Sequence, residues 1–352
     1  MNKTTPLHNK SRRLAAFGVL GALTVAACGS DSNDADSNDE PAPVEAEVEE
    51  EAMEDEEEAM EEEEAMEEEE AMEEEAMEED GSVPIVQLQF DGLPVLGDAS
   101  VYEGWVIVDE AAVSTGRFTV DEAGTQFDDD GNEVDHFAVD GTGASAFVLT
   151  IEPVVDEDPA PSDIHLLGGD VVDGTAQLSI AHPTAINTDF ATAAGSVEVV
   201  VPSAPDVAID TAGIWFFSDG AGSLTIPELP AGWVYEGWAV FDGIPVSTGR
   251  FTDANMADDF DGFSGPASGP ATPGEDFIVN APEGLEFPRS AAGATIVVSV
   301  EPIDDDSPAP FVLKPLVGDL PAEVERLGEY PLENTGDDTF PTGVANIIPA
   351  DV

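Results

Sequence analysis

One stretch of sequence occurs twice in the chain and indicates its fold. The first copy runs from Val101 to Val108 (VYEGWVIV) and, after a short turn, from Val113 to Thr119 (VSTGRFT). The second copy runs from Val234 to Phe241 (VYEGWAVF) and from Val246 to Thr252 (VSTGRFT). Each copy joins two runs of apolar, aromatic and β-branched residues through a turn, which is the pattern of a β-hairpin.

Side chains along each predicted strand alternate between its two faces, and both faces carry large apolar groups, so we expect the hairpin to lie inside a two-layer β-sandwich. The motif residues are Tyr102, Glu103, Trp105 and Arg117 in the first copy and Tyr235, Glu236, Trp238 and Arg250 in the second. They have two interpretations. They form either an aromatic ligand-binding patch, or core aromatics beside a cross-strand Glu–Arg pair in each copy.

A second block repeats as well and indicates a duplicated domain. Phe147–Pro153 (FVLTIEP) leads into an acidic loop that ends Pro-Ala-Pro, and so does Ile296–Pro302 (IVVSVEP). Turn signals recur at short intervals without a long helical period, which predicts an all-β chain. We expect two tandem antiparallel Ig-like β-sandwich domains, repeat 1 at 82–182 and repeat 2 at 195–320, joined by a linker at 183–194. Residues 321–352 are predicted as a C-terminal tail with a short helix at Ala322–Leu327.

The composition is strongly acidic and restricts the partners. The chain carries 77 acidic and nine basic residues, for a formal net charge of −68. Such a surface repels nucleic acid and anionic lipid headgroups, so we expect no nucleic-acid partner. Much of the charge lies in residues 28–81, where Glu-Ala-Met-Glu units predict a disordered, partly helical spacer. Its methionines could alternatively bind copper(I).

The first 27 residues have the pattern of an export signal. Basic residues precede an apolar run from Leu14 to Ala27. The run ends in Leu23-Thr24-Val25-Ala26-Ala27-Cys28, which resembles the lipobox of bacterial lipoproteins. That resemblance implies cleavage before Cys28, lipidation of its thiol and anchoring to the outer face of the cell membrane. A plain signal peptide or a short membrane anchor are the alternatives, and the choice between Sec and twin-arginine export stays open.

Cys28 is the one cysteine of the chain, so its modification leaves no thiol for a disulfide or a thiolate metal site. The three histidines beyond the export signal, His136, His165 and His182, are far apart in sequence and lie in no catalytic motif. Oxygen-bearing residues alternate in one acidic loop, at Asp128, Asp130, Asn132 and Asp135. Hard cations take such ligands, so this loop is either a calcium site or a solvated acidic loop. No other cofactor is expected.

The repeated motifs resemble a known family. An aromatic residue three positions before a tryptophan, the VSTGRF strand, and a strand that ends in Glu-Pro before an acidic Pro-Ala-Pro loop are together similar to the extracytoplasmic domain of anti-sigma-K factors. The resemblance covers most of residues 83–320, once in each repeat. It implies a sensor-like outer module. Sequestration of a sigma factor is not expected, because we expect the chain to be exported from its first residues.

These observations predict a non-catalytic binding or sensing module at the bacterial cell surface, anchored through Cys28. The alternative is a structural or adhesive envelope protein whose acidic loops bind calcium. The ligand or protein partner, the oligomeric state, and whether the two repeats share one site are left open by the sequence.

Overall fold

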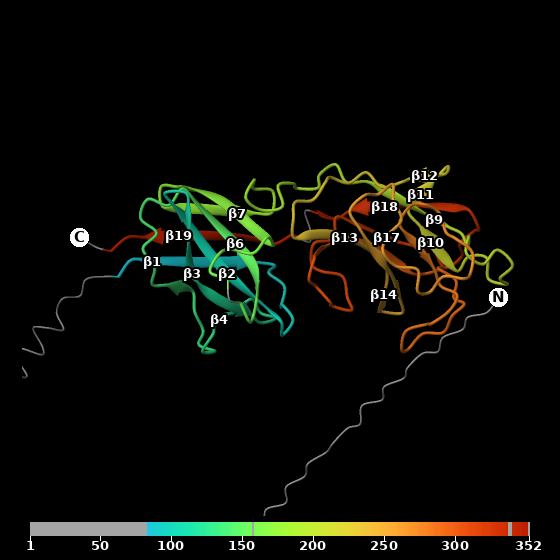
Figure 1. Cartoon of the computed structure of the whole chain (residues 1–352), viewed down its shortest axis with the longest axis horizontal. Coiled ribbons are helices and arrows are strands. Elements are labelled where there is room, and N and C mark those ends of the chain that lie inside the picture. Colours follow the sequence, from blue (N-terminus) through green and yellow to red (C-terminus); the bar gives the residue numbers. More distant parts are fainter. Residues whose placement is uncertain (1–82, 157, 337–339, 351–352) are drawn as a thin grey trace, which may run out of the picture. The chain divides into compact units, whose positions relative to one another are not determined.

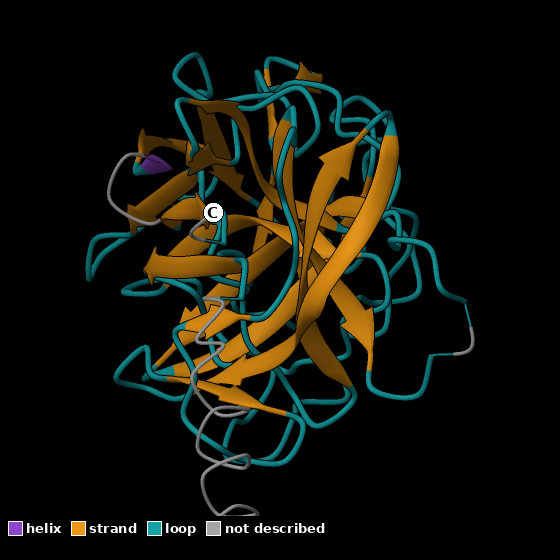
Figure 2. Ribbon diagram, turned by 90° about the vertical axis from the view of Figure 1, so that its left-hand side faces the viewer, coloured by secondary structure: helices purple, strands orange, loops and turns teal. Residues whose placement is uncertain are grey.

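The computed structural model describes residues 83–350 apart from residue 157 and residues 337–339 (Figure 1). The elements with assigned bounds in these ranges are all β-strands, and they pair antiparallel (Figure 2). The predicted all-β fold class is therefore confirmed. Within the same ranges, no helix has the length and apolar character needed to cross a membrane. The export signal, Cys28 and the acidic spacer fall outside the described residues.

The first lobe is a nine-stranded sheet in the order β4-β3-β2-β6-β7-β8-β19-β1-β5. Its strands are β1 (Ile85–Asp91), β2 (Ser100–Val108), β3 (Ala111–Val120), β4 (Gln126–Asp128), β5 (His136–Phe137), β6 (Ala146–Pro153), β7 (His165–Val172), β8 (Thr175–Ser179) and β19 (Thr342–Ile348). The two ends of the sheet meet, because the Gln126 side chain in β4 donates a hydrogen bond to the Leu88 carbonyl in β1 at 3.1 Å. The sheet thus curls over its own core as a barrel-like sandwich.

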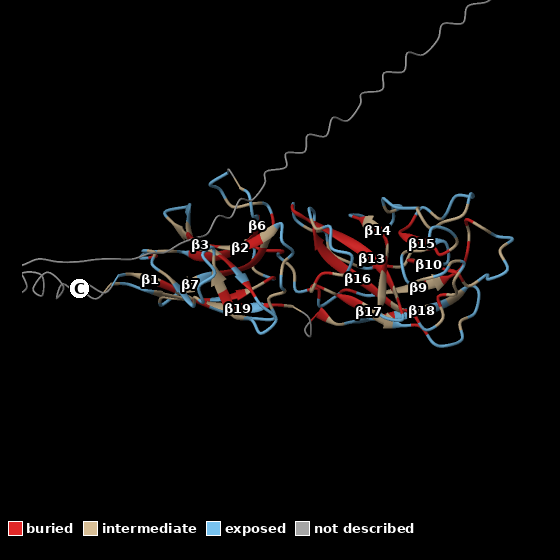
Figure 3. Ribbon diagram, turned by 90° about the horizontal axis from the view of Figure 1, so that it is seen from below, coloured by how far each residue is buried: buried red, intermediate tan, exposed pale blue. Residues whose placement is uncertain are grey.

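The second lobe is an eight-stranded sheet in the order β14-β13-β16-β17-β18-β9-β10-β15. Its strands are β9 (Gly195–Val199), β10 (Gly213–Trp215), β13 (Trp233–Phe241), β14 (Ile244–Phe251), β15 (Gly274–Asp276), β16 (Thr295–Pro302), β17 (Leu316–Asp319) and β18 (Gly328–Asn334), and a small hairpin of β11 (Phe217–Ser218) and β12 (Ala221–Gly222) is attached. Figure 3 shows that β13 and β16 are largely buried. Buried residues of both lobes form one continuous core cluster.

The two hairpins have the same detailed geometry. Glu103 pairs with Arg117 in the β2–β3 register, and Glu236 pairs with Arg250 in β13–β14. A β-bulge follows the strand glycine in each copy, between Gly104 and Trp105 and between Gly237 and Trp238. Residues at matching positions of the sequence repeat therefore occupy matching positions in the fold, which is the structural signature of the duplication.

Glycine is required at the bulge because another side chain already fills the space. A Cβ atom on Gly104 would lie 2.8 Å from the Phe147 ring and closer still to the hydroxyl of Thr115. The equivalent atom on Gly237 would lie 2.8 Å from Phe216. Real Cβ contacts are not this short, so each hairpin needs glycine for close packing rather than for a turn.

The predicted C-terminal tail is wrong. Residues 322–327 form bends and turns instead of a helix, and the segment beyond them supplies two strands, β18 and β19. Strand β18 belongs to the second lobe, whereas β19 crosses to the first lobe and inserts between β1 and β8. Seven residues of β19 pair with β1, and five pair with β8. Without β19 the first sheet has a gap, so the first lobe is not a continuous stretch of chain.

The predicted linker at 183–194 carries the chain from the first lobe to the second. It packs against residues near the point where the chain returns to the first lobe. The Phe190 ring lies edge-on to Phe340, with ring centroids 5.5 Å apart, and to Tyr235 at 6.5 Å. The Asn334 side chain donates to the carbonyls of Phe190 at 2.7 Å and Ala193 at 3.0 Å. The two segments that connect the lobes therefore contact each other, and these contacts help to hold the lobes together.

Deletion of residues 342–352 tests the role of β19. The deletion removes the strand that pairs with both β1 and β8, so we expect amide protons in these two strands to lose most of their protection from hydrogen exchange. Amides of β13 and β16 should keep theirs, because their own ladder is intact. Deletion of residues 349–352 alone, beyond the end of β19, is the matched control. Unchanged protection of β1 and β8 in the longer deletion would contradict the assignment.

Candidate functional site

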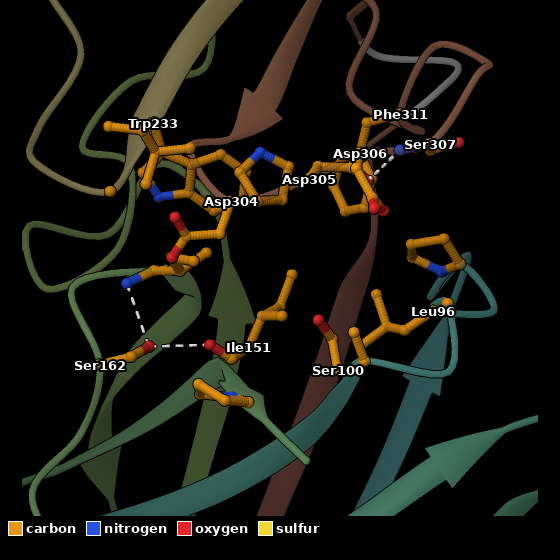
Figure 4. A pocket seen from close by; sticks show the side chains of 18 of the residues that line it. Leu96, Ser100, Ile151, Ser162, Trp233, Asp304, Asp305, Asp306, Ser307 and Phe311 are labelled. Carbon is orange, nitrogen blue, oxygen red and sulfur yellow. Dashed lines mark hydrogen bonds between the residues drawn. The ribbon is translucent and has the colours of Figure 1, made fainter. Parts of the chain in front are cut away.

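A cavity of about 1250 Å³ lies between the two lobes (Figure 4). The first lobe contributes residues 94–100, 151–153 and 162–164 to its walls, and the second lobe contributes 229–233 and 302–312. We call this cavity the interlobe pocket. Its volume exceeds the ~300–1,000 Å³ that is typical of sites for drug-sized ligands.

The same edge of each repeat forms the pocket. In the first lobe the Tyr102 hydroxyl donates to the Pro94 carbonyl at 2.7 Å, and in the second lobe the Tyr235 hydroxyl donates to the Pro227 carbonyl at 2.7 Å. Burial raises the pKa of both tyrosines far above the ordinary value, so each stays a neutral donor. Each hydrogen bond therefore fixes the segment before the tyrosine's strand. This segment forms part of the pocket wall, at 94–100 in the first lobe and at 229–233 in the second.

The lobes approach each other closely beside the pocket at Gly232. A Cβ atom at this position would lie 2.6 Å from the carbonyl carbon of Asp163 and 3.0 Å from the amide nitrogen of Ile164. Gly232 also has a positive φ of 85°, which disfavours other residues. A glycine at this position permits backbone-to-backbone contact between the lobes.

The arginine of each repeat motif holds a loop of the pocket wall. In the first lobe, Arg117 Nη2 donates to the carbonyls of Pro153 at 2.6 Å and Val154 at 3.1 Å. In the second lobe, Arg250 Nη1 donates to Ile303 at 3.1 Å, and its Nη2 donates to the Asp305 carbonyl. A guanidinium group suits this role because its donors form a rigid fork.

In the second lobe the glutamate of the motif orients that arginine. Arg250 Nε lies 3.0 Å from Glu236 Oε2, and the Ser247 hydroxyl donates to Glu236 Oε1 at 2.5 Å. In the first lobe Ser114 donates to Glu103 in the same way, at 2.5 Å. Burial raises the pKa of both glutamates, although these donors act in the opposite direction. Glu236 therefore acts on the pocket wall through Arg250.

The four motif aromatics are buried and form no surface patch. Tyr102 and Tyr235 are 0% and 1% exposed and belong to the core, whereas Trp105 and Trp238 are buried on the opposite face. Trp105 Nε1 donates to Thr150 at 2.9 Å. Trp238 Nε1 donates in the same way to Ser299, at 2.8 Å. The geometry supports the interpretation of these residues as core aromatics with a cross-strand Glu–Arg pair.

The pocket walls combine carboxylates with apolar rings and prolines. Six acidic residues line the pocket, and none of the lining residues is lysine, arginine or histidine. The acidic residues are Asp98, Glu152, Asp163, Asp304, Asp305 and Asp306. Trp233 and Phe311 form an aromatic pair on the wall, with ring centroids 6.1 Å apart. Figure 4 shows the Trp233 ring beside the Asp304 carboxylate.

Two polar atoms of the lining have no hydrogen-bond partner within the protein. They are the indole nitrogen of Trp233, which is 4% exposed, and Oε2 of Glu152, which is 1% exposed. The other carboxylate oxygen of Glu152 accepts from the Ser162 amide at 2.9 Å. An unpaired buried polar atom costs about 1–3 kcal/mol, so one donor and one acceptor at this pocket lack the partners that buried groups normally have.

Glu301 is the counterpart of Glu152 in the second lobe, and its carboxylate is satisfied from within. The Phe311 amide donates to Glu301 Oε1 at 2.8 Å, and the Ser299 hydroxyl donates to the same oxygen. Burial raises the Glu301 pKa from 4.5 to about 8. Burial also lowers the pKa of Lys314, whereas the charge of Glu301 raises it.

Glu301 makes the stability of the chain depend on pH. Between pH 4.5 and about 8 the folded chain keeps a proton that the unfolded chain releases, so the free energy of unfolding falls as pH rises. We expect Glu301→Gln to reduce this slope by up to about 1 kcal/mol per pH unit, measured by chemical denaturation across the window. Glu333→Gln, an exposed strand residue, is the control. Equal slopes for Glu301→Gln and the unaltered chain would contradict the assignment.

A further group of carboxyls lies in the second lobe, where Asp258 is half-buried and Glu275 and Asp276 are buried. Burial raises the pKa of both Asp258 and Glu275 to about 7. Asp276 is fully buried and accepts hydrogen bonds from Trp215 Nε1 at 2.8 Å and from the Ser203 amide at 2.8 Å. The sequence did not single out these residues, because carboxyl pairs are common by chance in so acidic a chain.

The acidic loop predicted as a calcium candidate is held by hydrogen bonds among its own residues. Asp128 accepts from the amide of Asn132 at 2.8 Å and from that of Asp130 at 3.0 Å. Hydrogen bonds from Asn132 lower the Asp128 pKa. Asp135 instead contacts His136 at 2.7 Å. The described residues hold no group of three or more His, Cys, Asp or Glu side chains suited to a metal ion. Calcium binding by this loop stays a prediction.

Two histidines that are distant in sequence come together beside the linker. His165 Nδ1 lies 2.7 Å from the Thr184 carbonyl, and His182 Nδ1 lies 2.8 Å from the Thr184 hydroxyl. His182 Nε2 is 3.3 Å from Asp170. The order hydroxyl, imidazole, carboxylate occurs in hydrolases, but this threonine also donates its amide to the same ring nitrogen at 3.3 Å. We interpret the group as a cap on the turn that starts the linker.

The pocket residues Trp233, Glu152 and Phe311 were not predicted as a site. The signal that marks Glu152 and Phe311 is the second repeated block, because its Glu-Pro strand end lines the pocket in both lobes. In the second lobe the acidic Pro-Ala-Pro loop after that strand lines the pocket as well. Trp233 lies outside this block and directly precedes the second copy of the hairpin motif. Comparisons with protein-family models, with curated proteins and with solved structures found no match.

Proposed function

We propose that this chain is a non-catalytic binding or sensing module, held on the outer face of a bacterial cell membrane by a lipid on Cys28. The basic segment, the apolar run and the LTVAAC sequence support export and lipidation. The acidic spacer at 28–81 supports a stand-off role, because its self-repelling charges keep the folded lobes away from the anionic membrane surface.

We further propose that the interlobe pocket is the binding site. The observation that carries this proposal is the pair of unpaired, buried polar atoms in its lining, Trp233 Nε1 and Glu152 Oε2. Both atoms have almost no accessible surface, so a ligand reaches them only when the side chains that cover them move. A ligand that then pairs with both would recover the free energy that their burial costs. The two repeats would then contribute to one joint site, since both supply its walls.

Binding rather than catalysis is supported by the chemistry of the lining. Hydroxyl groups line the pocket at Ser100, Ser162 and Ser307, and a hydroxyl needs an adjacent base such as histidine or lysine to act as a nucleophile. The lining residues include neither. The similarity to the outer domain of anti-sigma-K factors supports a sensor-like role for each repeat in the same sense.

A pocket-filling variant tests the binding site. Gly97 lines the pocket, and no atom lies within 4 Å of where its Cβ would be, so a larger side chain is tolerated at this point and Gly97→Trp is designed to obstruct the pocket. The full chain is screened by thermal melting against peptides, amines, glycans and acidic metabolites. We expect one class to raise the melting temperature of the unaltered chain and of Ala123→Trp, an exposed turn variant, but not of Gly97→Trp. Stabilisation that survives Gly97→Trp, or none from any class, overturns the proposal.

Metabolic labelling tests the anchor. A bacterium that expresses the full chain is fed radioactive palmitate, and we expect the label on the unaltered chain and not on Cys28→Ser. The variant should also leave the membrane fraction, because one acylated cysteine is the proposed attachment. Labelling of Cys28→Ser, or no labelling of either chain, would contradict lipidation at this residue.

A further inference from the structure

We propose that the interlobe pocket binds a cationic peptide segment, with Lys or Arg side chains facing the wall carboxylates and a backbone carbonyl accepting from Trp233 Nε1. This inference rests on the proposed function and adds the chemical class of the ligand. Four independent features of the pocket support it: its charge, its hydrogen-bonding capacity, its aromatic wall and its size.

The charge of the walls selects a cation. Asp304 and Asp306 of the second lobe and Asp163 of the first lobe are exposed and line the same pocket. Arg117 and Arg250 are not among the lining residues, and Nη2 of Arg117 and both Nη atoms of Arg250 already donate to backbone carbonyls. An anionic ligand would meet six carboxylates without a compensating base, whereas a cation gains from each of them.

The hydrogen-bonding capacity of the walls selects a donor-rich ligand that also carries an acceptor. Prolines line both sides and have no backbone N–H, so carboxylates and carbonyls dominate the surface. Glu152 Oε2 needs a donor, which an ammonium or guanidinium group supplies. Trp233 Nε1 needs an acceptor. A simple polyamine has donors only, whereas a peptide offers cationic side chains and carbonyl oxygens in one chain.

The aromatic wall and the volume fit the same class. The Trp233 and Phe311 rings form an apolar surface beside the carboxylates, which suits the aliphatic stem of lysine or arginine and allows cation–π contact. A cavity of about 1250 Å³ is larger than a single amine needs and holds several residues of an extended peptide.

The indole resonances provide a site-specific readout. The chain has four tryptophans, and three of their indole N–H groups donate within the protein, those of Trp105, Trp215 and Trp238. Only the Trp233 indole should shift in a ¹⁵N–¹H spectrum of the full chain when a ligand enters the pocket. Trp233→Phe removes this resonance and so assigns it.

The probe is a short capped peptide of alternating leucine and arginine, at physiological salt. The matched probe replaces arginine with citrulline, which keeps the shape and removes the charge. Spermidine and a neutral glycan complete the set. We expect the arginine peptide to shift the Trp233 resonance and to bind about tenfold or more tightly than the citrulline peptide.

Two variants of equal charge change locate the contact. We expect the double variant Asp304→Asn, Asp306→Asn to weaken binding of the arginine peptide by about tenfold, because each rim carboxylate contributes a modest ion pair. Asp129→Asn with Asp130→Asn, in an exposed loop away from the pocket, should leave binding within about twofold. Trp233→Phe should weaken binding by about 3- to 10-fold through loss of its hydrogen bond.

The outcomes separate the ligand class from the binding role. Equal binding of the citrulline peptide, or a Trp233 shift with the glycan or spermidine alone, overturns the cationic-peptide proposal and leaves the pocket as a binding site. Binding of the arginine peptide that leaves the Trp233 resonance unmoved, or that weakens equally in both double variants, is general attraction to an acidic surface and also overturns it.

Discussion

The insertion of β19 into the first sheet is the constraint on which the rest of the molecule depends. The chain leaves the first lobe through residues 183–194, builds the second lobe, and returns to complete the first sheet between β1 and β8. Two crossings hold the lobes more firmly than a single linker would, and they are joined by Phe190, Asn334 and Phe340. The close contact at Gly232 and the pocket beside it follow from this arrangement.

The repeated motif acts on the pocket from behind. Its tyrosine fixes one wall segment, and its arginine binds the carbonyls of the next. The glutamate and serine orient the arginine in the second lobe. A substitution in the motif would therefore alter the position of the pocket wall, although most motif side chains are buried in the lobes. Duplication of one domain placed two copies of this wall opposite each other, and the loop after β16 supplies three of the six lining carboxylates.

Local patterns in the sequence predicted the hairpins and the all-β class, because Tyr-Glu-Gly-Trp and Val-Ser-Thr-Gly-Arg-Phe determine register within a short span. They did not predict β19. Its partners, β1 and β8, lie more than 160 residues away, and pairing over that distance leaves no local signal beyond a run such as Thr342–Ile348. The pocket was missed for a related reason: Trp233 and Glu152 come from different lobes, and only the fold brings them to one cavity.

The contact between Gly232 and the first lobe tests the account most directly, because the pocket exists only if the two edges face each other there. In the full chain in solution, we expect a nuclear Overhauser effect between the α-protons of Gly232 and the amide proton of Ile164, because a Cβ added to Gly232 would lie only 3.0 Å from the Ile164 nitrogen. Its absence, with intralobe effects such as those between β13 and β16 intact, would show two lobes that fold without forming the pocket and would contradict the account.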